Sequence, residues 1–136
     1  MIDIDYFKHV NDPHGHLFGD RVLTEMGQLF RSWMRHTDIG GRYSGEEFAL
    51  FLPTTDENDA LIVSEDIRLA VENMAFVAGG ESLTITVSVG VAPLEHSHHK
   101  AFTGLISDAD VALYRAKNTG RNKVLSYKAS APVPIM

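Results

Sequence analysis

The chain has 136 residues, of which 44% are hydrophobic, and its 18 acidic side chains against 12 lysines and arginines give a net charge of −6. This length suits one domain with a buried core. The lack of cysteine excludes a disulfide framework and a thiolate metal site, and the acidic balance argues against a nucleic-acid partner. No apolar run approaches the ~18 residues of a membrane span. We therefore expect a cytoplasmic segment without membrane contact.

Residues 1–6 predict a strand that carries two acids. Asp3 and Asp5 lie two positions apart, so on a strand both carboxylates point to the same face. Aspartate is disfavoured in strands, whereas a hard cation such as Mg²⁺ binds oxygen ligands of this kind. A polar strand end and a metal anchor both explain the pair. Residues 7–16, which include a proline and a glycine, predict a turn-rich connection.

A helix is predicted from Phe18 to the region of Asp38. Its apolar residues recur every three and four positions, and Asp20 is placed in its first turn, at the positive end of the helix dipole. Arg35 and Asp38 are placed in its last turn, where they can form an exposed ion pair of little energetic weight.

Two adjacent acids follow the tip of a hairpin predicted over residues 39–52. Ser44 and Gly45 form the tip, and Glu46 and Glu47 come next. Two like charges beside an apolar strand are costly unless a cation uses them. Taken alone, this segment fits an ordinary solvated turn as well as a metal-binding one.

The second half of the chain alternates helices and strands. Lys117 and Arg121, near the end of the last helix, fit either the helix dipole or a phosphate ligand. Three histidines, His96, His98 and His99, lie in the loop after the strand predicted over 83–92. Because a loop offers no layer of supporting residues around a metal ion, we expect them to be solvated side chains rather than metal ligands. The predicted elements are an N-cap at Asp56, a helix over 60–74, a strand over 83–92, a helix from about Phe102 through Ala116 with Gly120 as its stop, a strand over 124–127 and a frayed tail over 128–136.

The order of these elements predicts an α/β (α+β) fold. It is a β-α-β-β-α-β core with a mostly antiparallel central sheet, flanked by helices and extended by one helix and one strand. In this plan the first strand and the hairpin are neighbours. Asp3 can then converge with Glu46 and Glu47.

Several segments in register resemble the GGDEF family of diguanylate cyclases. The likeness covers residues 1–127 as one domain and implies a nucleotidyl-cyclase, palm-like fold. It implies condensation of two GTP molecules into cyclic di-GMP with release of pyrophosphate, by a homodimer. The segments are Met1 to Asp12, Gly15-His16 with Gly19-Asp20, Ser44 to Phe48, and Ala116-Lys117 with Gly120-Arg121-Asn122.

The resemblance implies a catalytic and metal-binding role for the acids. Asp3 and Glu46, with the backbone carbonyl of Ile4, would hold two Mg²⁺ or Mn²⁺ ions. Glu47 would assist deprotonation of the attacking 3′-hydroxyl or bind the second metal. Two metals held by carboxylates suit an in-line attack on an α-phosphorus.

The resemblance also implies the contacts to GTP. Asn11 and Asp20 would read the guanine edge, since a carboxylate can accept from guanine N1–H and N2–H. Cationic side chains would hold the phosphates. The implied substrate-binding residues are Phe7, Lys8, Asn11, Asp20, Gly45, Lys117 and Arg121.

In this register Arg35 and Asp38 match the Arg-x-x-Asp motif of the family. The pair would bind cyclic di-GMP and inhibit the domain when product accumulates. Asp66 lies about where many members carry an arginine that completes this inhibitory site, and Ser44 replaces the first glycine of the family's turn.

The chain begins inside the expected first strand, so we expect a piece of a longer protein with an N-terminal sensory domain. A membrane anchor in that region is compatible with this expectation. Two alternatives to the active cyclase stay open. One is an inactive domain that serves as a receptor for cyclic di-GMP, and the other is a cyclase that makes a mixed dinucleotide.

Overall fold

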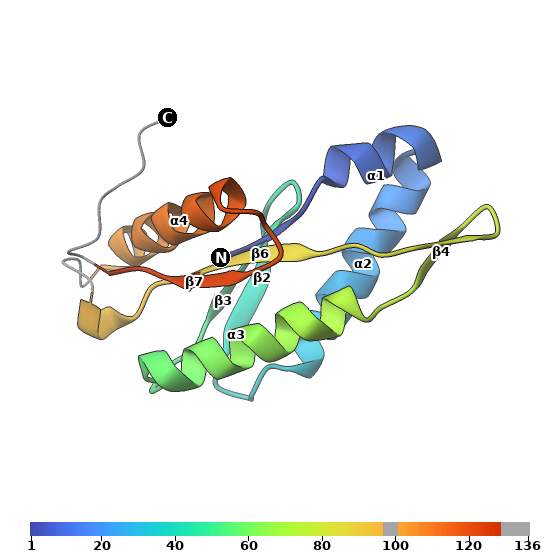
Figure 1. The fold of residues 1–136 in the computed structure, drawn as a ribbon. Helices are drawn as coiled ribbons and strands as arrows, with labels where there is room; N and C mark the ends of the chain where they lie inside the picture. The colour runs from blue at the N-terminus through green and yellow to red at the C-terminus, as the bar shows by residue number, and fades with distance from the viewer. Residues whose placement is uncertain (97–100, 129–136) are drawn as a thin grey trace.

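Figure 1 shows the computed structural model, which describes residues 1–96 and 101–128. The elements are β1 (Ile2–Ile4), α1 (Phe7–His14), α2 (His16–Ser32), β2 (Ile39–Ser44), β3 (Glu47–Phe51), α3 (Glu57–Glu72), β4 (Phe76–Ala78), β5 (Glu81–Leu83), β6 (Val87–Val91), the 3₁₀ helix η1 (Leu94–His96), α4 (Phe102–Asn118) and β7 (Val124–Ser126).

Five strands form the central sheet in the order β2-β3-β1-β6-β7. All neighbours are antiparallel except β6 and β7, which run parallel. β1 therefore lies in the middle, between the hairpin β2-β3 and β6. The predicted α+β fold with a mostly antiparallel sheet is confirmed.

Helices cover the sheet from both sides (Figure 1). On one side, α2 and α3 bury the larger apolar core, which includes Ile2 and Ile4 of β1 and Val87 of β6. On the other side, α4 packs Ala109 and Leu113 against Met1. Because side chains alternate along a strand, the two isoleucines of β1 face α2 and α3, while Asp3 faces α4.

The predicted turn-rich connection over residues 7–16 is wrong, since most of it forms α1. Only Phe7 and Val10 of this helix pack against the core, so its polar sequence carries too few apolar residues to show a helical period. The bend to α2 falls at Gly15, whose φ is +84°. Glycine adopts this left-handed conformation without a Cβ clash.

The ends of α2 also differ from the prediction. The helix begins at His16, so Asp20 lies beyond its first turn, and it ends at Ser32. Arg35 and Asp38 therefore lie in the turn between α2 and β2.

The strand predicted over residues 83–92 is divided in the structure. Its first residue belongs to β5, and only Val87–Val91 forms β6. β4 and β5 form a separate hairpin whose tip, Gly79 and Gly80, has φ of +58° and +84°. Successive positive φ values are typical of tight two-residue hairpin turns.

The N-cap at Asp56 is confirmed, because its side chain accepts a hydrogen bond of 2.8 Å from the backbone N–H of Asp59. His96 lies 3.3 Å from a carboxylate oxygen of Glu57. His98, His99 and the tail from residue 129 onward lie outside the described residues. Within residues 1–96 and 101–128, no helix has the length and apolarity needed to cross a membrane.

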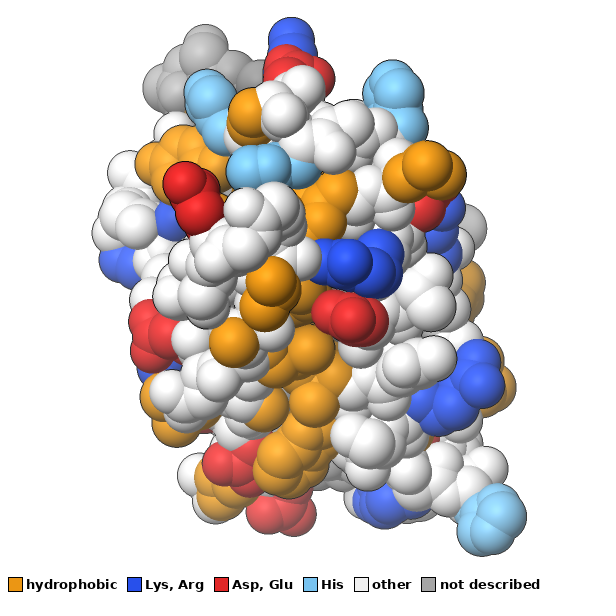
Figure 2. All heavy atoms as spheres, turned by 90° about the vertical axis from the view of Figure 1, so that its right-hand side faces the viewer, with side chains coloured by type: hydrophobic (Ala, Val, Ile, Leu, Met, Phe, Trp, Pro, Cys, Tyr) orange, Lys and Arg blue, Asp and Glu red, His pale blue; other side chains and the backbone are white. Residues whose placement is uncertain are grey.

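The face on the right of Figure 1, where α1, α2 and β4 lie, carries a band of hydrophobic side chains between charged ones (Figure 2). Exposed apolar side chains of these elements include Leu17, which is 86% exposed, and Val77, which is 53% exposed. This apolar surface thus lies partly on α1 and α2, the two helices that carry Phe7, Lys8, Asn11 and Asp20 of the predicted substrate residues.

Candidate active site

The pairing of β1 with β3 brings the first strand and the hairpin acids together. Asp3 lies directly opposite Glu47 in this antiparallel pair. Directly opposed residues have Cβ atoms about 5 Å apart on one face of the sheet. The backbone N–H of Ile4 also donates to the carbonyl of Glu46 at 3.2 Å. The predicted convergence of Asp3 with the hairpin acids is confirmed for Glu47, and the roles of Asp3, Glu46 and Glu47 stay predictions.

Asp3 is a buried carboxylate, only 4% exposed. The ammonium group of Lys117, on α4, donates to its Oδ2 atom. Burial raises the pKa of Asp3 above its usual value, while the hydrogen bond from Lys117 acts in the opposite direction. A cation beside Asp3 therefore offsets the cost of burying its charge.

Glu47 shares this environment. Burial raises its pKa, and the negative charge of Asp3 raises it further. Asp110 on α4 adds to the same effect, although the sequence analysis did not single it out. Its place seven residues before Lys117, two turns along one helical face, is the signal that could have found it.

The donor chemistry of this pair fits a hard divalent cation. Among the described residues, no three histidine, cysteine, aspartate or glutamate side chains already form a metal-binding group. Asp3 and Glu47 nevertheless supply carboxylate oxygens on one face, and Mg²⁺ commonly binds through one or two carboxylates together with substrate phosphates. The two acids are therefore suited to a cation that arrives with a nucleotide.

The turn between β2 and β3 leaves space for a ligand. Gly45 has a φ of +45°, and a Cβ built on it would meet no atom within 4 Å. Its carbonyl accepts a hydrogen bond of 2.6 Å from Nε of Arg42. Ser44 is the last residue of β2 and has no positive φ. A serine at this position therefore causes no backbone strain.

Asn11 and Asp20 come from the two helices after β1. The amide of Asn11 lies 3.1 Å from Nδ1 of His16, and its Oδ1 atom would be only 2.1 Å from a Cβ on Gly19. Glycine at position 19, which directly precedes Asp20 in the chain, thus lets the side chain of Asn11 lie against α2. Asp20 itself is exposed.

The predicted phosphate ligands come from two regions. Lys8 is exposed on α1. Lys117 and Arg121 belong to the end of α4 and the loop after it, and Nη1 of Arg121 donates to the carbonyl of Lys117 at 3.1 Å. The guanidinium carbon of Arg121 lies 4.6 Å from the ring centroid of Tyr6. Of the three cations, the structure places Lys117 in direct contact with Asp3.

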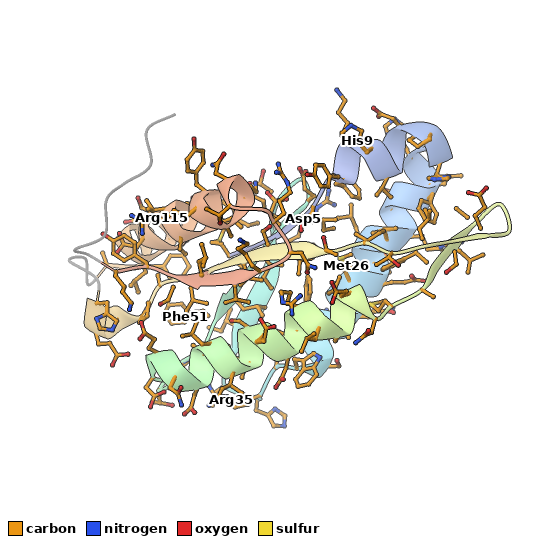
Figure 3. The ribbon with its side chains drawn as sticks, viewed as in Figure 1. Asp5, His9, Met26, Arg35, Phe51 and Arg115 are labelled. Atoms are coloured by element: carbon orange, nitrogen blue, oxygen red, sulfur yellow. The ribbon has the colours of Figure 1, made fainter. Side chains whose placement is uncertain are left out.

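Arg35 and Asp38 form the expected ion pair, with Nη2 and Oδ1 2.8 Å apart. The hydrogen bond from Arg35 lowers the pKa of Asp38. The same guanidinium donates to the carbonyl of Pro53 at 2.9 Å and to the hydroxyl of Thr55 at 2.7 Å. Figure 3 shows Arg35 at the opposite edge of the molecule from His9 of α1. Because Ile39 pairs with Phe51 and Ser44 pairs with Glu47, the ion pair lies beyond the opposite end of the β2-β3 hairpin from Glu47.

The chain matches the family described as "Diguanylate cyclase, GGDEF domain" over residues 1–123. Diguanylate cyclase A of Treponema denticola is 39% identical over 132 residues, which are 97% of this chain and 35% of that protein. The GGDEF domain of DgcB from Caulobacter crescentus, solved in complex with c-di-GMP, has a TM-score of 0.86 and 32% identity over 92% of this chain and 74% of that one.

A third similar protein is the active GGEEF domain of a diguanylate cyclase from Vibrio cholerae, with a TM-score of 0.85 and 36% identity over 95% of this chain and 81% of that one. This chain spans about a third of the length of the curated relatives it matches, 35% and 28% for two of them. The domain boundary at residue 127 stays a prediction. The match over residues 1–123, together with the shared fold, means that the chain belongs to the GGDEF family of diguanylate cyclase domains.

Proposed function

We propose that this chain is the catalytic domain of a cytoplasmic diguanylate cyclase that condenses two GTP molecules into one cyclic di-GMP and two pyrophosphates. The observation that carries this proposal is the buried carboxylate of Asp3, directly opposite Glu47 and in contact with Lys117. Acids with raised pKa values beside a fixed cation are typical of a reactive site.

In each of the two bond-forming steps, a 3′-hydroxyl attacks the α-phosphorus of the facing GTP. The new P–O bond forms as the bond to the β-phosphate oxygen breaks and pyrophosphate leaves. Glu47 accepts the hydroxyl proton. Mg²⁺ or Mn²⁺ ions, held by Asp3, Glu46, Glu47 and the carbonyl of Ile4, would neutralise the charge that develops on the phosphoryl oxygens and the leaving group.

The other predicted residues bind and orient the nucleotide. Lys8, Lys117 and Arg121 hold the phosphates as fixed cations. Asp20 and Asn11 read the guanine edge, since adenine offers no donor at the N1 position. This argues against a mixed-dinucleotide cyclase. Because one set of acids serves one triphosphate, a homodimer brings two GTP molecules face to face.

The direct test is incubation of the purified chain with GTP and Mg²⁺, followed by chromatography of the nucleotides. We expect cyclic di-GMP and pyrophosphate in a ratio of one to two. A folded, dimeric chain that forms no product would contradict the cyclase. Binding of added cyclic di-GMP by such a chain would instead support a receptor, a role for which the exposed guanidinium of Arg35, paired with Asp38, is suited.

Gly19→Ala should weaken GTP binding about tenfold, the equivalent of one lost hydrogen bond. The new Cβ would displace the side chain of Asn11, whose Oδ1 lies 2.1 Å from its position. Gly27→Ala in the same helix is the matched control, because its Cβ would meet only Phe48 at 3.8 Å. Isothermal titration with GTP measures both variants. Equal affinities in the two would remove Asn11 from guanine recognition.

Arg35→Ala should relieve inhibition by cyclic di-GMP, with little change in the initial rate. The substitution removes the guanidinium that a phosphodiester would bind, a group that lies beyond the opposite end of the β2-β3 hairpin from Glu47. Product titrations of the initial rate should show at least a tenfold rise in the inhibitory concentration. An unchanged concentration would assign Arg35 a structural role only, as the anchor of Pro53 and Thr55.

The remaining two thirds of the relatives' length leave room for an input domain and for partners. A diguanylate cyclase from Pseudomonas aeruginosa, SiaD, was solved in complex with its activator SiaC, and it shares 42% identity with this chain. We propose that the present domain is likewise controlled by a sensory segment or partner that sets dimerisation.

A further inference from the structure

The loop between α4 and β7 is held in an unusual backbone conformation. Three successive residues have positive φ: Gly120 at +114°, Arg121 at +60° and Asn122 at +46°. A non-glycine residue pays roughly 1–2 kcal/mol in the left-handed region. Arg121 is a long side chain in such a position. Conformations of this kind persist only where the surrounding structure holds them in place.

The first residue that fixes this loop is Asp5, which directly follows β1. Its Oδ2 accepts the backbone N–H of Asn122 at 3.0 Å and the hydroxyl of Thr86 at 2.7 Å. Its Oδ1 accepts the hydroxyl of Ser88 at 2.6 Å. Asp5 is 5% exposed, and Figure 3 shows it on the sheet between α1 and α4. Both of its oxygens thus accept from protein donors.

A second set of hydrogen bonds, from residues of α3, fixes the side chain of Asn122. Nη1 of Arg68 donates to its Oδ1 at 2.8 Å, and its Nδ2 donates to a carboxylate oxygen of Glu72. Arg68 is itself fixed by Glu65 at the opposite side of its guanidinium. One amide thus accepts from a cation and donates to an anion. Among side chains of this size only asparagine can do both while tolerating a left-handed backbone.

These hydrogen bonds to Asn122 fix the backbone next to Arg121. Its guanidinium stacks on the ring of Tyr6 and donates to the carbonyl of Lys117. Tyr6 directly follows Asp5 and also has a positive φ, +53°. Asp5 is therefore bonded to the backbone of Asn122 through its carboxylate and precedes Tyr6 directly in the chain, so it links the two residues that flank the Arg121 guanidinium.

We propose that Asn122 is a positioning residue that fixes Arg121, relative to Asp3 and Lys117, for contact with the β- and γ-phosphates. Asn122 touches no substrate in this arrangement. Its bonds to Arg68 and Glu72 of α3 and to Asp5 fix the backbone of the loop between α4 and β7, which carries Arg121. The inference rests on the proposed function, because it assumes that the triphosphate of GTP occupies the site beside Asp3.

Asn122→Gly is the most informative variant. Glycine keeps the positive φ and the N–H bond to Asp5, and removes only the amide bonds to Arg68 and Glu72. We expect the dissociation constant of GTP with Mg²⁺ to rise about tenfold, while that of GMP, which lacks the β- and γ-phosphates, changes less than twofold. Arg68→Met should reproduce this selective loss. Asn118→Ala is the control, since within residues 1–96 and 101–128 the hydrogen bond of that amide goes to the carbonyl of Tyr114, in its own helix.

A second readout needs no nucleotide. In the free wild-type chain, the side-chain NMR signals of Arg121 should be shifted upfield by the ring of Tyr6, and Asn122→Gly should abolish that shift. Retained ring-current shifts, or equal losses of GTP and GMP affinity, would overturn the positioning role. A wild-type chain that shows the shift but binds no GTP would contradict the proposed function and leave the hold of Asn122 on Arg121 standing.

Discussion

Replacement of Glu47 by glutamine should lower the rate of cyclic di-GMP formation by about a thousandfold or more and leave the fold intact. Glutamine keeps the size of the side chain and removes both its charge and its capacity to accept the 3′-hydroxyl proton. General bases alone contribute about 10²- to 10⁴-fold. Product formation is measured by chromatography, with Glu81→Gln on the exposed strand β5 as the control. A rate above a tenth of wild type would remove Glu47 from the mechanism.

The same variant should change how stability depends on pH. Burial raises the pKa of Glu47 in the folded chain, whereas the unfolded chain has the ordinary value of about 4.3. The folded state therefore holds the proton more tightly, and wild type loses stability as pH rises through the window between these two values. Glutamine does not titrate. In thermal unfolding, the melting temperature of Glu47→Gln should rise relative to that of wild type from about pH 4 upward. Parallel plots of melting temperature against pH for the two proteins would contradict the raised pKa of Glu47.

Gly90→Ala should destabilise the fold by about 3 kcal/mol or more, because the new methyl group meets backbone that cannot yield locally. Its Cβ would lie 2.2 Å from the carbonyl oxygen of Ala109 and 2.4 Å from the backbone nitrogen of Leu113. α4 would have to move away from β6. Since α4 carries Lys117, the contact with Asp3 would be lost as well.

Urea denaturation measures this loss as a lowered midpoint. Gly41→Ala is the matched control, because a Cβ at that position meets no atom within 4 Å and its φ is not positive. We expect its midpoint to stay within experimental error of wild type. A Gly90→Ala midpoint equal to that of Gly41→Ala would mean that the packing of α4 on β6 is looser than the structure describes.

The sequence predicted the parts of the site that depend on local pattern. The alternation in β1 and the turn after Ser44 were sufficient to place Asp3 beside Glu47, because neighbouring strands follow from element order. The same reasoning missed α1, whose core contacts are only Phe7 and Val10.

Long-range partners could not be foreseen. Asp3 and Asp5 look equivalent in the sequence, yet one contacts Lys117 and the other accepts from Thr86, Ser88 and Asn122. Their difference depends on residues that are distant in the sequence. Thr86 and Asn122, for example, lie 81 and 117 positions from Asp5. No local period or spacing carries that information.

The central place of β1 has a consequence for biosynthesis. β1 is translated before both of its neighbours, β3 and β6, which end at residues 51 and 91, so it has no complete set of partners until most of this domain has been translated. Pairings between such distant segments slow folding. The apolar Ile2 and Ile4 are meanwhile exposed on the nascent chain, and we expect the yield of folded protein to depend on chaperones that bind that segment.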